Sequence, residues 1–289
     1  MSRVTLPLII AALGTSISDG SIAGSRPGGS SSSSAVTVSA SDAELIACAE
    51  RAPACDWAWA ETAPAAFVQR LHTTVGAVDV RITTASSPAA AARAFLLARL
   101  GYADGAPFYR VLVAPSGGGG GGGGAQRKFV AQWGYRGAPA VDGAWLLQQT
   151  SNATAAVVPP GNVRGSVALG TSEVAGPLPP YCSAAACSQG FSVEFFVNLA
   201  DNSRLDDADF STFGEIDEAG MASIDRLYSG YGECADFCAQ DASSPYCVPA
   251  PGGGWAGVNL TRWLIEGEPY LRAFPLLDRV VRTELLPLQ

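Results

Sequence analysis

Histidine is almost missing from this sequence, in which His72 is the only one among 289 residues. A single imidazole argues against catalysis by histidine dyads or a Ser-His-Asp triad, and against metal sites built from histidine clusters. His72 precedes the first strand that the pattern predicts, and we expect it to be exposed and without a catalytic role. Any enzymatic activity should therefore use chemistry that does not depend on a histidine pair, triad or metal cluster.

Charge is also scarce, because only 15% of the residues are charged and the net charge is −8, whereas about 25% charged residues is usual. An acidic chain without a cluster of lysine and arginine argues against binding to nucleic acid or to anionic membrane surfaces. Long apolar runs are missing too. The run Leu6–Leu13 is far shorter than the roughly 20 residues that a membrane span needs, so we expect no membrane span.

The N-terminus has the pattern of a secretory signal. Arg3 supplies a positive charge, Leu6–Leu13 the apolar segment, and small residues follow up to Gly24, so we predict a signal peptide over 1–24. The glycosylation triplets that begin at Asn152 and Asn259 agree with secretion. We expect a secreted protein or one in the lumen of the endomembrane system; a plastid reached by a bipartite signal, and a disordered or buried N-terminus, remain open.

The cysteines lie in local groups, which predicts small disulfide-closed loops in an oxidising compartment. Since there are seven, at least one thiol is left unpaired or pairs with another molecule. A zinc site is the rival interpretation for the last group, but it lacks a nearby fourth ligand. The three groups are Cys48 and Cys55; Cys182 and Cys187; and Cys234, Cys238 and Cys247.

Residues 25–40 are a Gly/Ser-rich segment that predicts a disordered linker, and 41–72 predict an N-terminal extension that is helical or irregular. Alternation over Val75–Thr83 predicts a strand. A helix should follow, because Ser87 can cap it, Pro88 suits its first turn and Gly101 suits its end.

Most other patterned runs are short, strand-like and divided by turn residues, with a second helix predicted at Ala219–Tyr228. Such a series favours a mainly β protein, either a barrel or a sandwich with helical caps. The strand-like runs are Phe108–Val113, Phe129–Trp133, Gly165–Leu169, Phe191–Leu199 and Phe210–Ile216.

Eight consecutive glycines, residues 117–124, separate two of these strands. A glycine tract buries no apolar surface, and the cost of closing a loop rises only slowly with its length, so we predict a mobile insertion at a hairpin tip over 114–128. The tract is not a phosphate-binding loop, because no Lys-Ser/Thr follows it. Residues 173–190 form a second predicted insertion, which a Cys182–Cys187 pair would staple.

Without the insertions, the order of short motifs resembles the cyclophilin family of peptidyl-prolyl cis-trans isomerases. The resemblance covers roughly residues 74–233, and the tail Ile265–Val281 is similar to a divergent branch of the family. The motifs in order are GYADGAPFYRV, FVAQWG, RGSVALG, VEFFVNL and SRLDDADFSTFGEIDEAGM.

The resemblance implies a closed eight-stranded antiparallel β-barrel capped by two α-helices, with a substrate groove on its outer surface. We expect this domain over 73–289, with a C-terminal extension at 234–289. The implied activity is isomerisation of X-Pro bonds in proline-containing peptides or unfolded client proteins, without a cofactor or metal, and we expect a monomer.

The site residues follow from the same motifs. Arg110 matches the catalytic arginine, and Gln132, Phe129 and Phe196 match the other catalytic positions. Because neighbouring residues on a strand face opposite sides, Phe196 should face the groove if Phe195 belongs to the core. The predicted substrate-binding residues are Val130, Gly170, Thr171, Leu205 and Phe210.

This sequence departs from the family pattern at several of these positions. Val130 stands where methionine is usual, Arg204 where many members carry tryptophan, and Phe210 near a usual histidine. The segment from Thr171 to Phe191 is too long to align firmly with the family, which puts the backbone-binding contribution there in doubt. These departures leave two alternatives open: a non-catalytic module that binds proline peptides, and a structural secreted glycoprotein.

Overall fold

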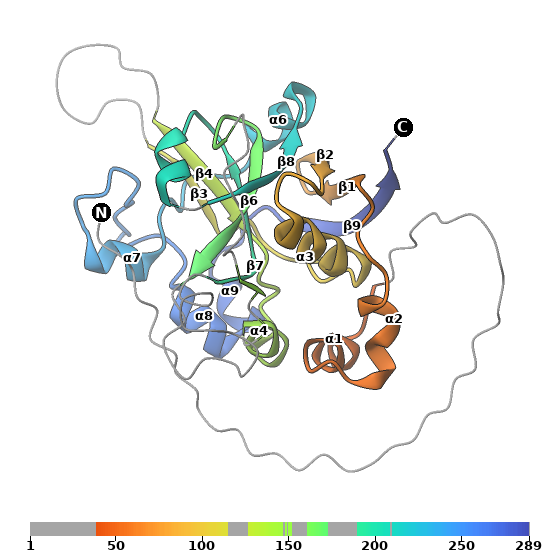
Figure 1. The fold of residues 1–289 in the computed structure, drawn as a ribbon. Helices are drawn as coiled ribbons and strands as arrows, with labels where there is room; N and C mark the ends of the chain where they lie inside the picture. Colours follow the sequence, from red (N-terminus) through yellow and green to blue (C-terminus); the bar gives the residue numbers. More distant parts are fainter. Residues whose placement is uncertain are drawn as a thin grey trace, which may run out of the picture.

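The structure is a computed structural model that describes residues 39–114, 127–146, 148, 150–151, 161–172, 190–208 and 210–288 (Figure 1). The predicted signal peptide, most of the linker, the glycine tract, Asn152 and the pair Cys182 and Cys187 lie outside these residues.

The described chain is built around one antiparallel sheet, which confirms the mainly β prediction. Its continuous path runs β3-β4-β7-β6-β8-β2-β1-β9, and β5 pairs with β7 beside it. Every pairing is antiparallel. The strands are β1 (Ala66–Thr73), β2 (Gly76–Thr83), β3 (Arg110–Val113), β4 (Lys128–Trp133), β5 (Thr150–Ser151), β6 (Ser166–Ser172), β7 (Gly190–Asn198), β8 (Thr212–Ile216) and β9 (Val280–Pro287).

The sheet is an open half-barrel, so the expectation of a closed barrel is wrong. Strands β3 and β9 end the path and do not pair with each other; among the described residues, the segments that precede them meet at one bridge, between Pro107 and Arg279. Backbone bonds from Phe108 N to Asp278 O and from Val280 N to Ala106 O flank this bridge, and Gly105 N also donates to Val280 O. The contact does not continue as a ladder, since β3 begins only at Arg110.

The segments that we predicted as N- and C-terminal extensions each supply a strand to the sheet. Residues 66–72, predicted as part of the N-terminal extension, form most of β1, which pairs with β2 and β9. Strand β9 comes from the C-terminal extension. Phe67 and Leu71 on β1 are buried in the core, so both extensions contribute to the packed body of the protein.

Among the described helices, α3 follows its sequence signals closely. Pro88 begins it and Gly101 follows its last turn at φ +60°, as predicted for a helix end. Ser87 takes the N-cap position, although no described group is bonded to its Oγ. The helices are α1 (Asp42–Ala49), α2 (Asp56–Trp59), α3 (Pro88–Arg99), α4 (Pro139–Leu146), α6 (Glu218–Ile224), α7 (Ala235–Gln240), α8 (Leu260–Glu266) and α9 (Glu268–Leu271), with 3-10 turns at Pro53–Cys55 and Ser203–Ala208.

The two faces of the sheet carry separate hydrophobic clusters. Phe195 belongs to the main core and its neighbour Phe196 to the second cluster, as the alternation of side chains along a strand requires. We call the second set, which consists of Leu112, Val130, Ala168 and Phe196, the groove cluster.

Two disulfides join cysteines that are close in sequence, Cys48 to Cys55 and Cys238 to Cys247, while Cys234 is free and buried. The second disulfide uses two of the three ligands of the zinc alternative, which is therefore excluded for this group. In the described part of the chain, no helix has the length and apolar character that crossing a membrane requires.

Candidate functional site

Three of the predicted catalytic residues lie in one row across the sheet. Arg110 on β3 pairs directly with Gln132 on β4, which pairs directly with Phe196 on β7. Side chains at directly paired positions project from the same face of a sheet. The row continues to Ala168 on β6, so the guanidinium and the groove cluster share the face opposite the main core.

The Arg110 guanidinium is held by two partners. Its Nη1 donates to Gln132 Oε1 at 2.5 Å, and its Nε and Nη2 donate to Glu233 Oε1 and Oε2 at 2.5 and 2.6 Å. Only 16% of the Arg110 side chain and 8% of the Glu233 side chain are exposed. Burial works against the charge, but the charge and hydrogen bonds of Glu233 outweigh it and raise the pKa of Arg110. The arginine therefore stays protonated.

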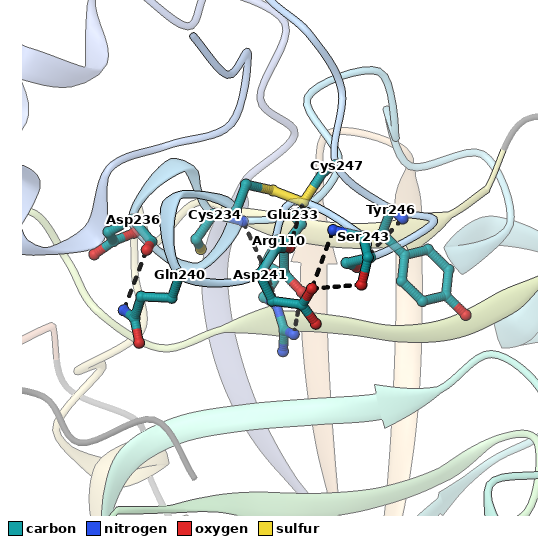
Figure 2. The surroundings of a disulfide bond; sticks show 11 residues. Arg110, Glu233, Cys234, Asp236, Gln240, Asp241, Ser243, Tyr246 and Cys247 are labelled. Carbon is teal, nitrogen blue, oxygen red and sulfur yellow. Dashed lines mark hydrogen bonds and ion pairs between the residues drawn. A yellow bond between two sulfur atoms is a disulfide. The ribbon is translucent and has the colours of Figure 1, made fainter. Parts of the chain in front are cut away.

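Glu233 directly precedes a disulfide-closed segment, and no sequence pattern places it beside Arg110. It is 123 residues from Arg110 in the chain, and it is followed by α7 and the loop that ends at Cys247 (Figure 2). Phe237 on α7 lies 5.6 Å from the Arg110 guanidinium, measured to the ring centroid. We call residues 233–247 the C-terminal clasp.

The aromatic end of the site surrounds the groove cluster. Phe210 packs edge-on against Phe196, with ring centroids 5.6 Å apart, and Phe129 and Leu205 also contact the cluster. Tyr246 of the C-terminal clasp stacks on Phe129 at 6.1 Å. The clasp therefore reaches both ends of the site, the arginine through Glu233 and the aromatic side through Tyr246.

Arg204 replaces an expected aromatic residue and still contacts the site. Its guanidinium lies 4.6 Å from the centroid of the Phe129 ring, and it donates to Asn202 Oδ1 at 3.2 Å. A cation over a ring face is attracted by the ring quadrupole. The substitution thus exchanges a flat apolar surface for a charged one beside Phe129.

A chain of buried amides positions the loop that supplies Leu205 and Phe210. Asn202 Nδ2 donates to Phe129 O and to Asn198 Oδ1, both at 2.8 Å. Asn198 Nδ2 donates to Asn162 Oδ1 at 3.0 Å, and Asn162 Nδ2 donates to Phe210 O at 2.8 Å. Buried amides need such partners, so this network ties β4, β7 and the loop to one another. Sequence reasoning did not identify it.

The remaining predicted residues differ in how they relate to the row. Val130 belongs to the groove cluster and is 3% exposed, the same fraction as Phe196. Gly170 lies at a bulge in β6, where an added Cβ would be 3.2 Å from Glu194 Cβ. The backbone of Thr171 pairs with Phe191 further along β6, and its side chain is outside the described set.

A family model described as "Cyclophilin type peptidyl-prolyl cis-trans isomerase/CLD" matches residues 68–241, more than half of the 289 residues. The chain belongs to the cyclophilin family. The match begins within β1 and ends just after α7, so it includes Glu233 but not Tyr246 of the clasp. A comparison with curated protein sequences gives no match.

Solved cyclophilins are similar to this cyclophilin at low identity. A cyclophilin type isomerase from Cryptosporidium parvum is 11% identical with a TM-score of 0.42, and the alignment covers 78% of this chain and 98% of that one. The same protein in the presence of the dipeptide Ala-Pro gives 11% identity, a TM-score of 0.37 and coverage of 77% and 99%. A cyclophilin from Hirschia baltica is 15% identical with a TM-score of 0.35, and the alignment covers 56% of this chain and 67% of that one.

Proposed function

We propose that this cyclophilin is a peptidyl-prolyl cis-trans isomerase that acts on proline-containing segments of client proteins. The observation that carries the proposal is the row Arg110–Gln132–Phe196, which sets a charged guanidinium beside an apolar, aromatic cluster on the outer face of the sheet. Family membership supports the same activity.

The chemistry requires neither a base nor a metal. The barrier to rotation about a peptide bond comes from amide resonance and is about 18–20 kcal/mol, and X-Pro bonds exchange in tens to hundreds of seconds without a catalyst. Twisting the bond localises a lone pair on the prolyl nitrogen. An arginine N–H can donate to that nitrogen in the twisted state but hardly in the planar one, which is differential stabilisation of the transition state.

Each part of the site has a place in this mechanism. A charge-assisted hydrogen bond contributes roughly 1.5–3 kcal/mol, and arginine keeps its charge in proteins; Glu233 raises the pKa of Arg110 further, against the effect of burial. The groove cluster with Phe129 and Phe210 would hold the proline ring, and Gln132, fixed to Arg110, would bind the peptide backbone. Holding one half of the peptide while the other half turns supplies the rest of the effect.

We further propose that the protein works in the secretory pathway, on folding clients. The signal-like N-terminus supports this setting. The two disulfides among the described residues also agree with this setting, since each closes a short loop of the kind that persists in oxidising compartments.

The test is isomerisation of a proline peptide followed by NMR exchange spectroscopy. We expect Arg110→Lys, which keeps the charge but loses the planar fork, to lower kcat/KM by about 10- to 100-fold, the equivalent of one charge-assisted bond. Arg70→Lys is the matched control, because Arg70 forms a similar pair with Asp79 on β1 and β2. Equal rates for the wild type and Arg110→Lys would remove the mechanism.

One observation favours the second candidate, a non-catalytic module that binds proline peptides. Glu233 neutralises Arg110 and Tyr246 stacks on Phe129, so both ends of the site already have partners within the chain. For such a module, peptide resonances would shift on binding, but no exchange between the cis and trans forms would appear. Exchange cross-peaks at catalytic protein concentrations would exclude it.

A further inference from the structure

The hydrogen bonds of Arg110 occupy only part of its guanidinium. Arginine has five N–H donors, of which Glu233 takes two and Gln132 one. Glu233 binds the edge formed by Nε and Nη2, and Gln132, which lies next to Phe196 in the row, binds Nη1. By count, one N–H on Nη1 and one on Nη2 stay available after these three bonds.

The carboxylate of Glu233 is itself fixed by the C-terminal clasp. Cys234 N donates to Glu233 Oε1 at 2.8 Å, and the backbone N of Glu233 donates to Tyr246 O at 2.9 Å. Gly232 permits this approach, because it has a φ of +66° and a Cβ there would lie 2.3 Å from Tyr246 O. The disulfide between Cys238 and Cys247 closes the same loop.

We propose that Glu233 is the positioning residue of the site, a role that rests on the proposed isomerase function. It holds the Nε–Nη2 edge of Arg110 from the side of the clasp, so that the N–H groups left on Nη1 and Nη2 keep a fixed position beside the groove cluster. A flexible arginine would have to order its side chain in each catalytic cycle. A misplacement of about 1 Å in a catalytic group can cost 100-fold in rate.

A purely inhibitory contact would have a different geometry. A carboxylate that competes with substrate would bind the free end of the guanidinium, the Nη1–Nη2 edge. Glu233 instead pairs through Nε, the nitrogen next to the side-chain stem, and leaves the Gln132 contact at Nη1 intact. The pair therefore orients the fork without using all of its donors.

The experiment compares Glu233→Gln with the wild type and with Asp79→Asn. Glutamine is isosteric but offers only one acceptor, so it loses the bidentate pair while it avoids a buried cavity. Asp79→Asn makes the same chemical change in the pair with Arg70, which lies on β1 and β2. For each protein, kcat and KM are measured on a proline peptide by NMR, together with the Nε–Hε resonance of Arg110.

We expect Glu233→Gln to lower kcat by about 10- to 100-fold through misplacement of the guanidinium, with KM within about twofold. The Arg110 Nε–Hε signal should lose its hydrogen-bonded shift and exchange faster with water. Asp79→Asn should change neither the rate nor this signal. Circular dichroism and melting curves will show whether Glu233→Gln is folded. If it is not folded, the Arg110 Nε–Hε signal is measured in Glu233→Asp instead.

The outcomes separate the inference from the proposed function. An active wild type whose kcat is unchanged or raised by Glu233→Gln would overturn the inference and leave the function standing; a raised kcat would show that Glu233 restrains the enzyme. An unchanged Arg110 Nε–Hε signal would overturn it as well. A wild type without isomerase activity would remove the function first, and the positioning role with it.

Discussion

Two arginine–carboxylate pairs in this protein use the same atoms in very different surroundings. Arg110 binds Glu233 through Nε and Nη2 at 2.5 and 2.6 Å, and Arg70 binds Asp79 through Nε and Nη2 at 2.6 and 2.8 Å. The side chains of the first pair are 16% and 8% exposed, and those of the second are 37% and 32% exposed. Bond lengths are thus nearly equal, and burial is the difference.

The comparison shows how burial by neighbouring residues changes the contribution of an ion pair to stability. The Arg70 pair joins neighbouring strands, with Arg70 directly opposite Asp79, and solvent screens it. The Arg110 pair is buried by the C-terminal clasp. In the clasp, Phe237 lies beside the Arg110 guanidinium, and Tyr246 stacks on Phe129. Exposed pairs contribute about 0–1 kcal/mol, whereas breaking one partner of a buried pair is far more costly.

The largest expected effect comes from Glu233→Ala. It leaves Arg110 buried with Gln132 as its remaining side-chain acceptor in the described structure, and removing one partner of a buried pair costs roughly 3–5 kcal/mol. Urea denaturation measures the free energy of unfolding, with Asp79→Ala as the comparison. Similar losses in both variants would show that burial does not distinguish the pairs.

A smaller loss in the free energy of unfolding should follow from Cys238→Ser together with Cys247→Ser. The disulfide closes a loop with a sequence separation of 9, for which the loss is about 2–3 kcal/mol. Hydrogen exchange should also become faster at Arg110 Nε, because the clasp loosens, and remain unchanged at Arg70. The control is Cys48→Ser with Cys55→Ser, whose loop is of similar size; if it affected Arg110 equally, the clasp would not be the cause.

Tyr246→Ala should lower the free energy of unfolding by less than the loss of the Cys238–Cys247 disulfide. It removes the ring that stacks on Phe129, a contact worth about 0.5–1.5 kcal/mol beyond the buried area, but it keeps the backbone carbonyl that accepts from Glu233 N. Tyr246→Phe retains the ring and serves as the control. Thermal melts of the two variants give the difference, and identical melts would mean that the stack contributes nothing.

The smallest effect is the pH dependence of the Arg70 pair. The hydrogen bond from Arg70 lowers the pKa of Asp79 below its usual 3.8, against the opposing effect of burial. The pair's contribution is therefore complete above pH 3.8 and lost as pH falls through the lower folded pKa. Since both groups are about one-third exposed, Asp79→Asn should cost at most about 1 kcal/mol at pH 7. Urea titrations should show that the difference in the free energy of unfolding between the wild type and Asp79→Asn becomes smaller below pH 3.8. A difference that grows as the pH falls would contradict the assigned pKa shift of Asp79.

Local sequence signals predicted local structure well. Pro88 and Gly101 mark the two ends of α3 as expected, and the alternation around Phe195 and Phe196 separates the core face from the groove face. The second helix ends at Ile224, earlier than predicted, because apolar residues at helical spacing also continue into the turn that follows. Family resemblance supplied Arg110, Gln132 and Phe196 as candidates.

Long-range features could not be predicted in the same way. No pattern near Arg110 indicates a partner 123 residues away, and Tyr246 is recognisable as part of the site only from its stack on Phe129. The closed barrel was expected from the family, but closure depends on whether two distant segments align, and these segments meet only at the isolated bridge between Pro107 and Arg279. The strand β1 was missed because an alanine-rich, helix-like segment precedes it.

The row of paired residues has a consequence for how this surface can change. Arg110, Gln132, Phe196 and Ala168 come from four strands, and their alignment is set only by register. One residue inserted within β4 would turn Gln132 inward and bring Ala131 to the outer face. Evolution can therefore lengthen the connections between these strands freely, while it can edit the strands themselves only by substitution.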